Sequence, residues 1–163
     1  MSSVEALLRA LSEQSVEFII VGGVAAAVHG SARVTYDLDV VYRRNTENLA
    51  RLAACLSCHQ PYLRGAPPGL PFRLDVDTLR QGLNFTLTTN LGEVDLLDEI
   101  AGGGSYEDLL PDSVELRVFG VTCLCLGLEK LMHVKRAAGR RKDLEAVAEM
   151  EALLEERRKT KRR

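Results

Sequence analysis

Two short apolar runs near the start of the chain constrain the fold most. Residues 18–21 read Phe-Ile-Ile-Val, and residues 36–42 alternate and are rich in β-branched side chains, which is typical of buried strands. Gly22 and Gly23 end the first run, and residues 24–29 are alanine-rich, as in a short helix that Gly30 closes. The pattern therefore predicts helices packed on a β-sheet.

The remaining segments extend this pattern. Apolar positions at helical spacing predict helices at residues 4–11, 46–58, 128–138 and 142–157, with one helical turn at 77–81. Alternating runs predict strands at 84–89, 93–97, 114–119 and 121–126. We expect a loop in the proline-rich residues 60–72 and a flexible link at 101–105. The prediction is an α+β fold with a mixed sheet of about five strands, flanking helices and a C-terminal helical pair.

The bulk composition fits one soluble domain. The 163 residues are 46% hydrophobic and 27% charged, so the chain can bury a core. No stretch approaches the ~20 apolar residues of a membrane span, and residues 1–14 are charged and amphipathic, unlike a signal peptide. We expect a single domain over residues 1–163, with the helical pair at 127–157 and a fraying basic tail at 158–163. We also expect a cytoplasmic protein without membrane contact, whose four cysteines are thiols.

Charge is distributed unevenly along the chain. Residues 1–128 carry nine basic and 16 acidic side chains, whereas residues 129–163 carry 12 basic and seven acidic ones. An acidic body with a basic C-terminal segment suits a site where carboxylates bind a metal and basic groups meet phosphate. A basic helix that only aids solubility is the alternative, and the tail at 157–163 is either solvated or touches nucleic acid.

Asp37 and Asp39 are the first candidate site residues. Side chains two positions apart on a strand point to the same face, so these carboxylates project together while Leu38 and Val40 point to the core. Two adjacent carboxylates repel each other unless a cation neutralises them. Magnesium favours one or two carboxylates plus substrate phosphates. A solvated strand face with two ordinary aspartates is the alternative.

Two further features point to the same chemistry. Gly22 and Gly23 lie between a strand and a helix, where glycine lets the backbone approach a ligand and free N–H groups attract phosphate. Asp95 lies in an apolar strand, which is unusual for a carboxylate. If its strand lies beside the strand of Asp37, Asp95 becomes a third metal ligand or a general base. The alternatives are turn glycines and an edge-strand aspartate that faces water.

Taken together, these residues carry a family resemblance. The run IIVGG, 13 further residues, DLDV and a later lone aspartate resemble the signature of the DNA polymerase β-like nucleotidyltransferase superfamily. HGSARVTYDLD (29–39) and KRAAGRRKDLE (135–145) resemble its small bacterial branch, which includes toxin–antitoxin and abortive-infection nucleotidyltransferases. The resemblance covers residues 16–145.

The resemblance implies a role for each matching residue. Asp37, Asp39 and Asp95 would hold Mg²⁺, or Mn²⁺ in its place, and act as the catalytic residues. The nucleoside triphosphate would be bound by Gly22, Gly23, Ser31, Arg33, Lys135, Arg140 and Lys142. The reaction would join a nucleoside monophosphate to an acceptor hydroxyl on a tRNA, a protein or a small molecule and release pyrophosphate.

Other functions are compatible with the same residues. A non-catalytic nucleotide-binding, antitoxin or regulatory module on the same fold is the main alternative, and a metal-dependent phosphohydrolase is a weaker one. A cognate partner protein could supply acceptor recognition. A zinc site would need Cys55, Cys58, Cys123 and Cys125 to converge, and we expect core thiols instead. We expect His29 to be structural.

Overall fold

The computed structural model describes all residues from Met1 to Arg163. Its helices are α1 (Ser3–Glu13), α2 (Gly22–Val28), α3 (Thr46–Ser57), α4 (Val76–Gln81), α5 (Tyr106–Leu109), the 3₁₀ turn η1 (Leu110–Asp112), α6 (Leu128–Ala138) and α7 (Arg141–Lys161). Its strands are β1 (Phe18–Val21), β2 (Asp37–Tyr42), β3 (Tyr62–Leu63), β4 (Phe85–Thr88), β5 (Glu93–Leu97), β6 (Glu99–Ile100), β7 (Gly104–Ser105), β8 (Ser113–Val118) and β9 (Val121–Leu126).

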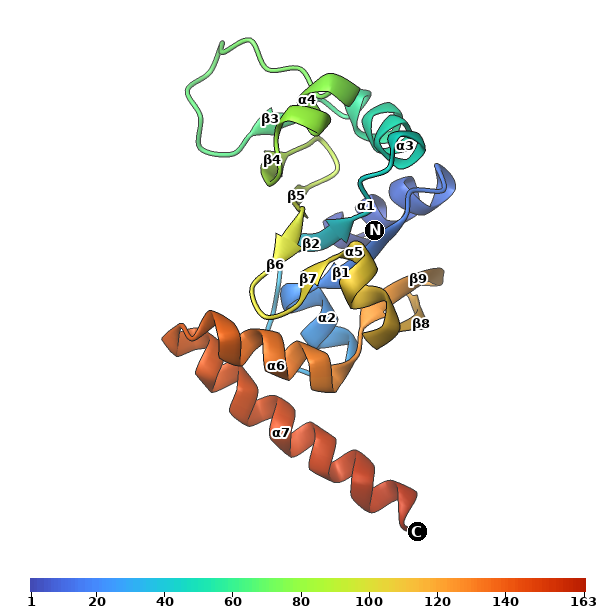
Figure 1. Cartoon of the computed structure of the whole chain (residues 1–163), viewed down its shortest axis with the longest axis vertical. Coiled ribbons are helices and arrows are strands. Elements are labelled where there is room, and N and C mark those ends of the chain that lie inside the picture. Colours follow the sequence, from blue (N-terminus) through green and yellow to red (C-terminus); the bar gives the residue numbers. More distant parts are fainter.

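A seven-stranded mixed sheet forms the centre of the molecule, in the order β3-β4-β5-β2-β1-β9-β8 (Figure 1). β2 runs antiparallel to β1 and parallel to β5, so two strands far apart in sequence lie side by side. Strands β1, β2 and β5 contribute many of the fully buried residues, and α1 and α3 contribute leucines to the same core. The predicted α+β class and mixed sheet are confirmed.

Two segments predicted to have no regular structure, residues 60–72 and 101–105, contain short strands. β3 lies inside the proline-rich segment and pairs with β4, and β7 lies inside the glycine-rich segment and pairs with β6. Each is two residues long, too short to show a period of two. The predictions of a loop throughout 60–72 and of a flexible link at 101–105 are therefore wrong at these strands, and the main sheet has seven strands rather than about five.

The C-terminal helices form a pair at one end of the molecule (Figure 1). α6 ends at Gly139, whose φ of 66° places it in the left-handed region that glycine adopts at low cost. α7 continues to Lys161, so the prediction that the chain frays after Arg157 is wrong for the next four residues. Salt bridges such as Lys159–Glu155, one helical turn apart, support this end.

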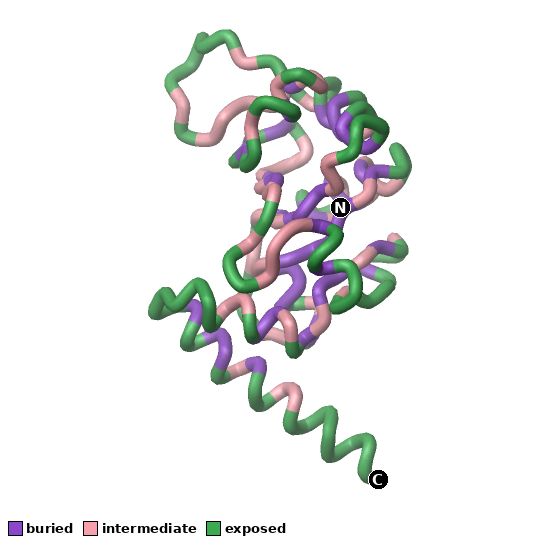
Figure 2. The backbone as a smooth tube through the Cα atoms, in the orientation of Figure 1, coloured by how far each residue is buried: buried purple, intermediate pink, exposed green.

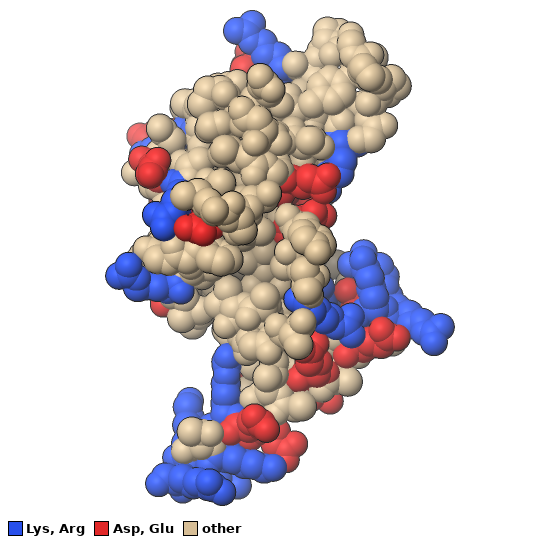
Figure 3. Space-filling view, turned by 180° about the vertical axis from the view of Figure 1, so that it is seen from behind, with Lys and Arg blue, Asp and Glu red and all other residues tan.

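The last turns of α7 project from the body. Figure 2 shows this part of the helix exposed, and Figure 3 shows Lys and Arg side chains gathered at its free end. No helix combines the length and the apolar character that crossing a membrane requires. The exposed end of α7 is thus a basic, water-facing surface.

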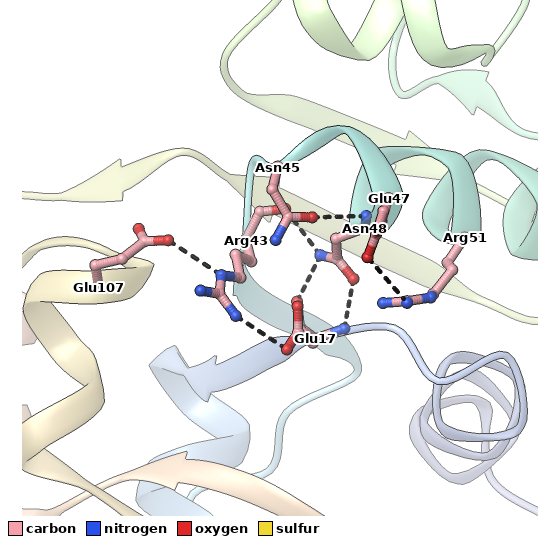
Figure 4. A network of polar contacts seen from close by, with 7 residues as sticks. All are labelled: Glu17, Arg43, Asn45, Glu47, Asn48, Arg51 and Glu107. Atoms are coloured by element: carbon pink, nitrogen blue, oxygen red, sulfur yellow. Dashed lines mark hydrogen bonds and ion pairs between the residues drawn. The ribbon is translucent and has the colours of Figure 1, made fainter.

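A polar network at one end of β1 and β2 fixes the position of α3 (Figure 4). Asn48 is fully buried, and its side-chain amide donates to the carbonyl oxygens of Glu17 and Arg43 and accepts from the Glu17 N–H at 2.7 Å. Asn45 caps the helix by accepting from the Asn48 N–H. Arg43 links Glu17 to Glu107 through two ion pairs. α3 is therefore tied to both central strands.

Replacing Asn48 with alanine is expected to destabilise the protein by about 2–4 kcal/mol. The part-buried Glu17 N–H and Arg43 carbonyl lose their side-chain partner, and the Glu17 carbonyl keeps only its bond from the Arg43 N–H. Urea unfolding monitored by circular dichroism measures the change. Glu47→Ala, in the same network but with an exposed side chain, is the control and should change the stability by less than about 0.5 kcal/mol. Equal effects of the two substitutions would contradict the role of Asn48.

Candidate functional site

Four carboxylates face one another across the parallel pair β2 and β5. The register places Asp37 opposite Glu93 and Asp39 opposite Asp95. All four lie at alternate positions of their strands and therefore share one face of the sheet. Leu38 and Val40, which alternate with Asp37 and Asp39 along β2, are buried in the core. Like charges directly opposite each other on neighbouring strands are destabilising, so this arrangement demands cations nearby.

Gly22 closes one side of the carboxylate group. A Cβ on this residue would lie 2.1 Å from Oδ2 of Asp39, and its φ of 66° is left-handed. The pair of glycines begins α2 rather than preceding it, and Val21 provides no side-chain cap to the first turn. A Cβ on Gly23 would lie 2.9 Å from Oγ1 of Thr35. Glycine is required at residue 22 because the backbone lies against a carboxylate.

The Asp39 carboxyl has a pKa raised from 3.8 to about 7. Burial is the largest cause, followed by the hydrogen bond and charge of Asp95 and by the charge of Asp37, while Lys135 acts in the opposite direction. The pKa of Glu93 is also raised, mainly because its protonated carboxyl can donate a hydrogen bond to Asp37. Carboxyl groups this close retain a proton near neutral pH when no further cation is present.

A cleft of about 640 Å³ opens over this face, and all ten residues predicted from the sequence line it. β2 and β5 supply Asp37, Asp39 and Asp95, and the start of α2 supplies Gly22 and Gly23. The connection from α2 to β2 supplies Ser31 and Arg33, whereas the helical pair supplies Lys135, Arg140 and Lys142. The acidic and basic segments of the sequence thus meet in one cleft.

Asp143, which the sequence analysis did not select, holds the basic side of the cleft. Its carboxylate is 1% exposed, accepts from Nε of Arg140 at 2.6 Å and lies 3.5 Å from Nζ of Lys135. Burial works to raise the pKa of Asp143, but the hydrogen bond from Arg140 and the charge of Lys135 outweigh it and lower the pKa. Lys135 also attracts Asp39 across the cleft.

Ser31 and Arg33 are held by α7. The Ser31 hydroxyl donates to Glu149, and the backbone N–H of Ala32 donates to the same carboxylate at 2.9 Å. Arg33 forms ion pairs with Glu149 at 3.4 Å and Glu145 at 3.9 Å. The segment therefore lines the cleft, but its polar groups already have protein partners. Glu149 gave no signal in sequence because it lies on an acidic, otherwise ordinary helix face.

Arg64 is a third residue that the sequence did not reveal. It follows β3, and its Nη1 lies 3.1 Å from Asp95 Oδ1 and 3.7 Å from Asp37 Oδ2, while Nε lies 3.5 Å from Glu93. Residues 60–72 were predicted to be a loop, which hid its neighbours. Glu93 itself carried a signal, because it is two residues before Asp95 and shares its face.

The donor set suits a divalent cation that arrives with phosphate oxygens. No three His, Cys, Asp or Glu side chains form a ready-made metal cage. The carboxylates nevertheless lie side by side, and Asp95 Oδ1 is buried without a hydrogen-bond partner. Magnesium usually takes one or two carboxylates and completes its shell with water and phosphate. Asp37, Asp39 and Asp95 fit that pattern.

His29 and the four cysteines, the other residues considered from the sequence, do not line the cleft. His29 is buried, its Nε2 donates to the Leu126 carbonyl at 2.8 Å, and its Nδ1 faces Arg157 at 3.2 Å. Burial is the main reason that its pKa is lowered. All four cysteines are free thiols, of which only Cys58 is exposed.

No protein-family profile and no curated protein sequence matches the chain. Solved structures do match. A candidate nucleotidyltransferase from Thermotoga maritima aligns with a TM-score of 0.54 at 15% identity, covering 88% of this chain and 86% of that chain. An antigenic nucleotidyltransferase-like protein from Paracoccidioides brasiliensis aligns at 0.54 and 17% identity, covering 90% and 72%.

A third structure is that of the antibiotic-resistance factor ANT(2'')-Ia, with a TM-score of 0.53, 15% identity and coverage of 97% of this chain and 90% of that chain. At such identities the likeness establishes the fold. The chain has the fold of these nucleotidyltransferase structures, so the fold that the sequence resemblance implies is confirmed.

The raised pKa of Asp39 predicts a pH dependence of stability. Between about pH 4 and 7 the folded protein keeps a proton that the unfolded chain releases, so the free energy of unfolding should fall as the pH rises, by on the order of 2–4 kcal/mol. Urea unfolding at several pH values in EDTA measures it. Asp39→Asn keeps every other titrating group, and an unchanged slope in this variant would show that Asp39 is not the cause.

Gly22→Ala is expected to destabilise the protein by more than about 2 kcal/mol, because a Cβ collides with Asp39 in a left-handed backbone. Gly69→Ala is the matched control, since Gly69 has a φ of 90° but nothing within 4 Å of the added atom. Gly69→Ala should lower the free energy of unfolding by only about 1 kcal/mol, the cost of placing alanine in a left-handed backbone conformation. Thermal unfolding distinguishes the two, and similar losses would mean that contact with Asp39 is unimportant.

Proposed function

We propose that the protein is a nucleotidyltransferase that moves a nucleoside monophosphate from a nucleoside triphosphate to an acceptor hydroxyl and releases pyrophosphate. One observation carries this proposal: Asp39 and Asp95 lie side by side on β2 and β5, next to Asp37, in a cleft whose opposite wall carries Lys135 and Arg140. Carboxylates facing cations across a cleft are the arrangement that a metal–triphosphate complex needs.

The two walls of the cleft have different roles in this proposal: one binds the metal ion and the other binds phosphate. Asp37, Asp39 and Asp95 would hold Mg²⁺ or Mn²⁺, and the bound cation would supply positive charge for the triphosphate and the leaving pyrophosphate. Lys135, Arg140 and Lys142 attract the triphosphate from the opposite side. Close packing of Gly22 on Asp39 fixes that carboxylate and shapes the floor of the cleft.

The transfer itself is an in-line displacement. The acceptor oxygen forms a bond to the α-phosphorus while the bond from that phosphorus to the pyrophosphate oxygen breaks. In this proposal Asp95, which lies opposite Asp39 on β5, accepts the proton that the acceptor hydroxyl loses. Positioning and charge stabilisation then supply most of the rate.

The branch of the superfamily and the acceptor that we propose are based on the sequence. The runs at residues 29–39 and 135–145 support the small bacterial branch with its toxin–antitoxin and abortive-infection members, and both runs border the cleft. The acceptor we propose is a tRNA end or a protein hydroxyl, and the exposed basic end of α7 favours the RNA. A cognate partner protein completes acceptor recognition in this proposal.

The proposal is tested by incubating the protein with α-phosphate-labelled triphosphates, Mg²⁺ and either tRNA or protein acceptors. Asp39→Asn and Asp95→Asn are expected to lose at least about 100-fold of the transfer rate. Asp39→Asn should at the same time be more stable than the wild type near pH 7, because it removes a carboxyl that resists ionisation. Lost activity with gained stability excludes misfolding as the cause.

Asp77→Asn, whose side chain is 82% exposed on α4, is the control and should keep full activity. Transfer that survives both Asp39→Asn and Asp95→Asn would contradict the assignment of the carboxylates. Binding of triphosphate that depends on these aspartates, without transfer to any acceptor, would instead favour the non-catalytic module.

A further inference from the structure

Arg64 contacts the carboxylate group from the side opposite the helical pair. Its guanidinium approaches three of the four carboxylates, those of Asp37, Glu93 and Asp95, at 3.1–3.7 Å. Its side chain is 23% exposed, and it reaches the group from the edge of the sheet, one residue after β3. No other Arg or Lys forms an ion pair with Asp37 or Asp95.

The contacts of Arg64 differ from those of a fixed structural arginine. Nη2 donates to the Leu87 carbonyl at 2.9 Å, but Nε of Arg64 and Oδ1 of Asp95 are both buried without a hydrogen-bond partner. By contrast, Arg140 donates two hydrogen bonds to Asp143. Arg64 is therefore held at the carboxylates mainly by charge, and such a contact yields to a stronger cation more easily than a hydrogen-bonded pair.

We propose that Arg64 is a positioning residue that serves as a built-in counterion, holding the carboxylates of β2 and β5 together before the metal–nucleotide complex binds and giving up its contacts with Asp37 and Asp95 when the complex arrives. This inference rests on the proposed function. The inference adds to that function a residue that neutralises the carboxylates of the metal-free protein. The divalent cation then has to compete with Arg64 for Asp37 and Asp95.

Two consequences follow from electrostatics. Without Arg64 the carboxylates of neighbouring strands repel one another unopposed on this side, so the metal-free protein becomes less stable. A divalent cation, in turn, no longer competes with a positive charge a few ångströms away, which is worth about tenfold in affinity even in a water-like dielectric. Removal of one side chain thus weakens the metal-free protein and strengthens cation binding, a combination that loss of packing alone does not produce.

The test compares wild type, Arg64→Met and Arg64→Lys. Calorimetric titration with Mn²⁺, with and without a non-hydrolysable ATP analogue, gives the affinity, and thermal unfolding in EDTA and in Mn²⁺ gives the stability. We expect Arg64→Met to unfold at a lower temperature in EDTA, to bind Mn²⁺ about tenfold more tightly and to gain more stability from Mn²⁺ than the wild type. Arg64→Lys, which keeps the charge, should stay near the wild type.

Arg80→Met removes an arginine paired with an exposed carboxylate on α4 and should leave Mn²⁺ affinity unchanged. Equal or weaker Mn²⁺ binding by Arg64→Met, in a wild type that does bind the ion, would overturn the role of Arg64 and leave the proposed function intact. A lysine variant that behaves like the methionine variant would also overturn it. If neither the wild type nor Arg64→Met binds Mn²⁺, even with the ATP analogue, the proposed function fails and the inference fails with it.

Discussion

Repulsion between carboxylates on β2 and β5 is the constraint on which the rest of the site depends. The parallel register sets Asp37 against Glu93 and Asp39 against Asp95 on one face of the sheet. Such a surface lowers the stability of the fold. Burial of the core beneath it, where Leu38 and Val40 are fully enclosed, offsets this loss. Burial is the main cause of the raised pKa of Asp39 in the metal-free protein, and the charges of Asp95 and Asp37 add to it.

The cations that offset this repulsion come from two distant parts of the chain. Arg64 reaches the carboxylates from the edge of the sheet, and Lys135 acts on Asp39 from α6. The two differ in how they are held. Asp143 fixes Lys135 and Arg140 through a buried carboxylate, whereas the side chain of Arg64 has a single hydrogen bond, to a backbone carbonyl. Two of the three basic residues on the wall that would meet phosphate are therefore held by a buried carboxylate, whereas Arg64 is held mainly by charge.

Much of the site could be predicted from the sequence because its signals are local. A period of two sets Asp37 and Asp39 on one face, and an apolar strand makes Asp95 conspicuous. The neighbours of these residues depend on tertiary pairing instead. Nothing local shows that β5 lies parallel to β2, or that a two-residue strand inside a proline-rich segment brings Arg64 to Asp95. Short strands were missed for the same reason, since two residues carry no period.

The position of α7 couples the site to the far end of the chain. Glu149 of this helix binds the Ser31 hydroxyl and the Ala32 N–H, and Arg157, two turns later, binds His29. The first part of the segment between α2 and β2, residues 29–33, is thus held by one helix, and that helix begins at the basic wall of the cleft. A partner or nucleic acid that engages the exposed end of α7 would act on the same helix that fixes Ser31 and Arg33, so recognition at the surface and the shape of the cleft share one rigid element.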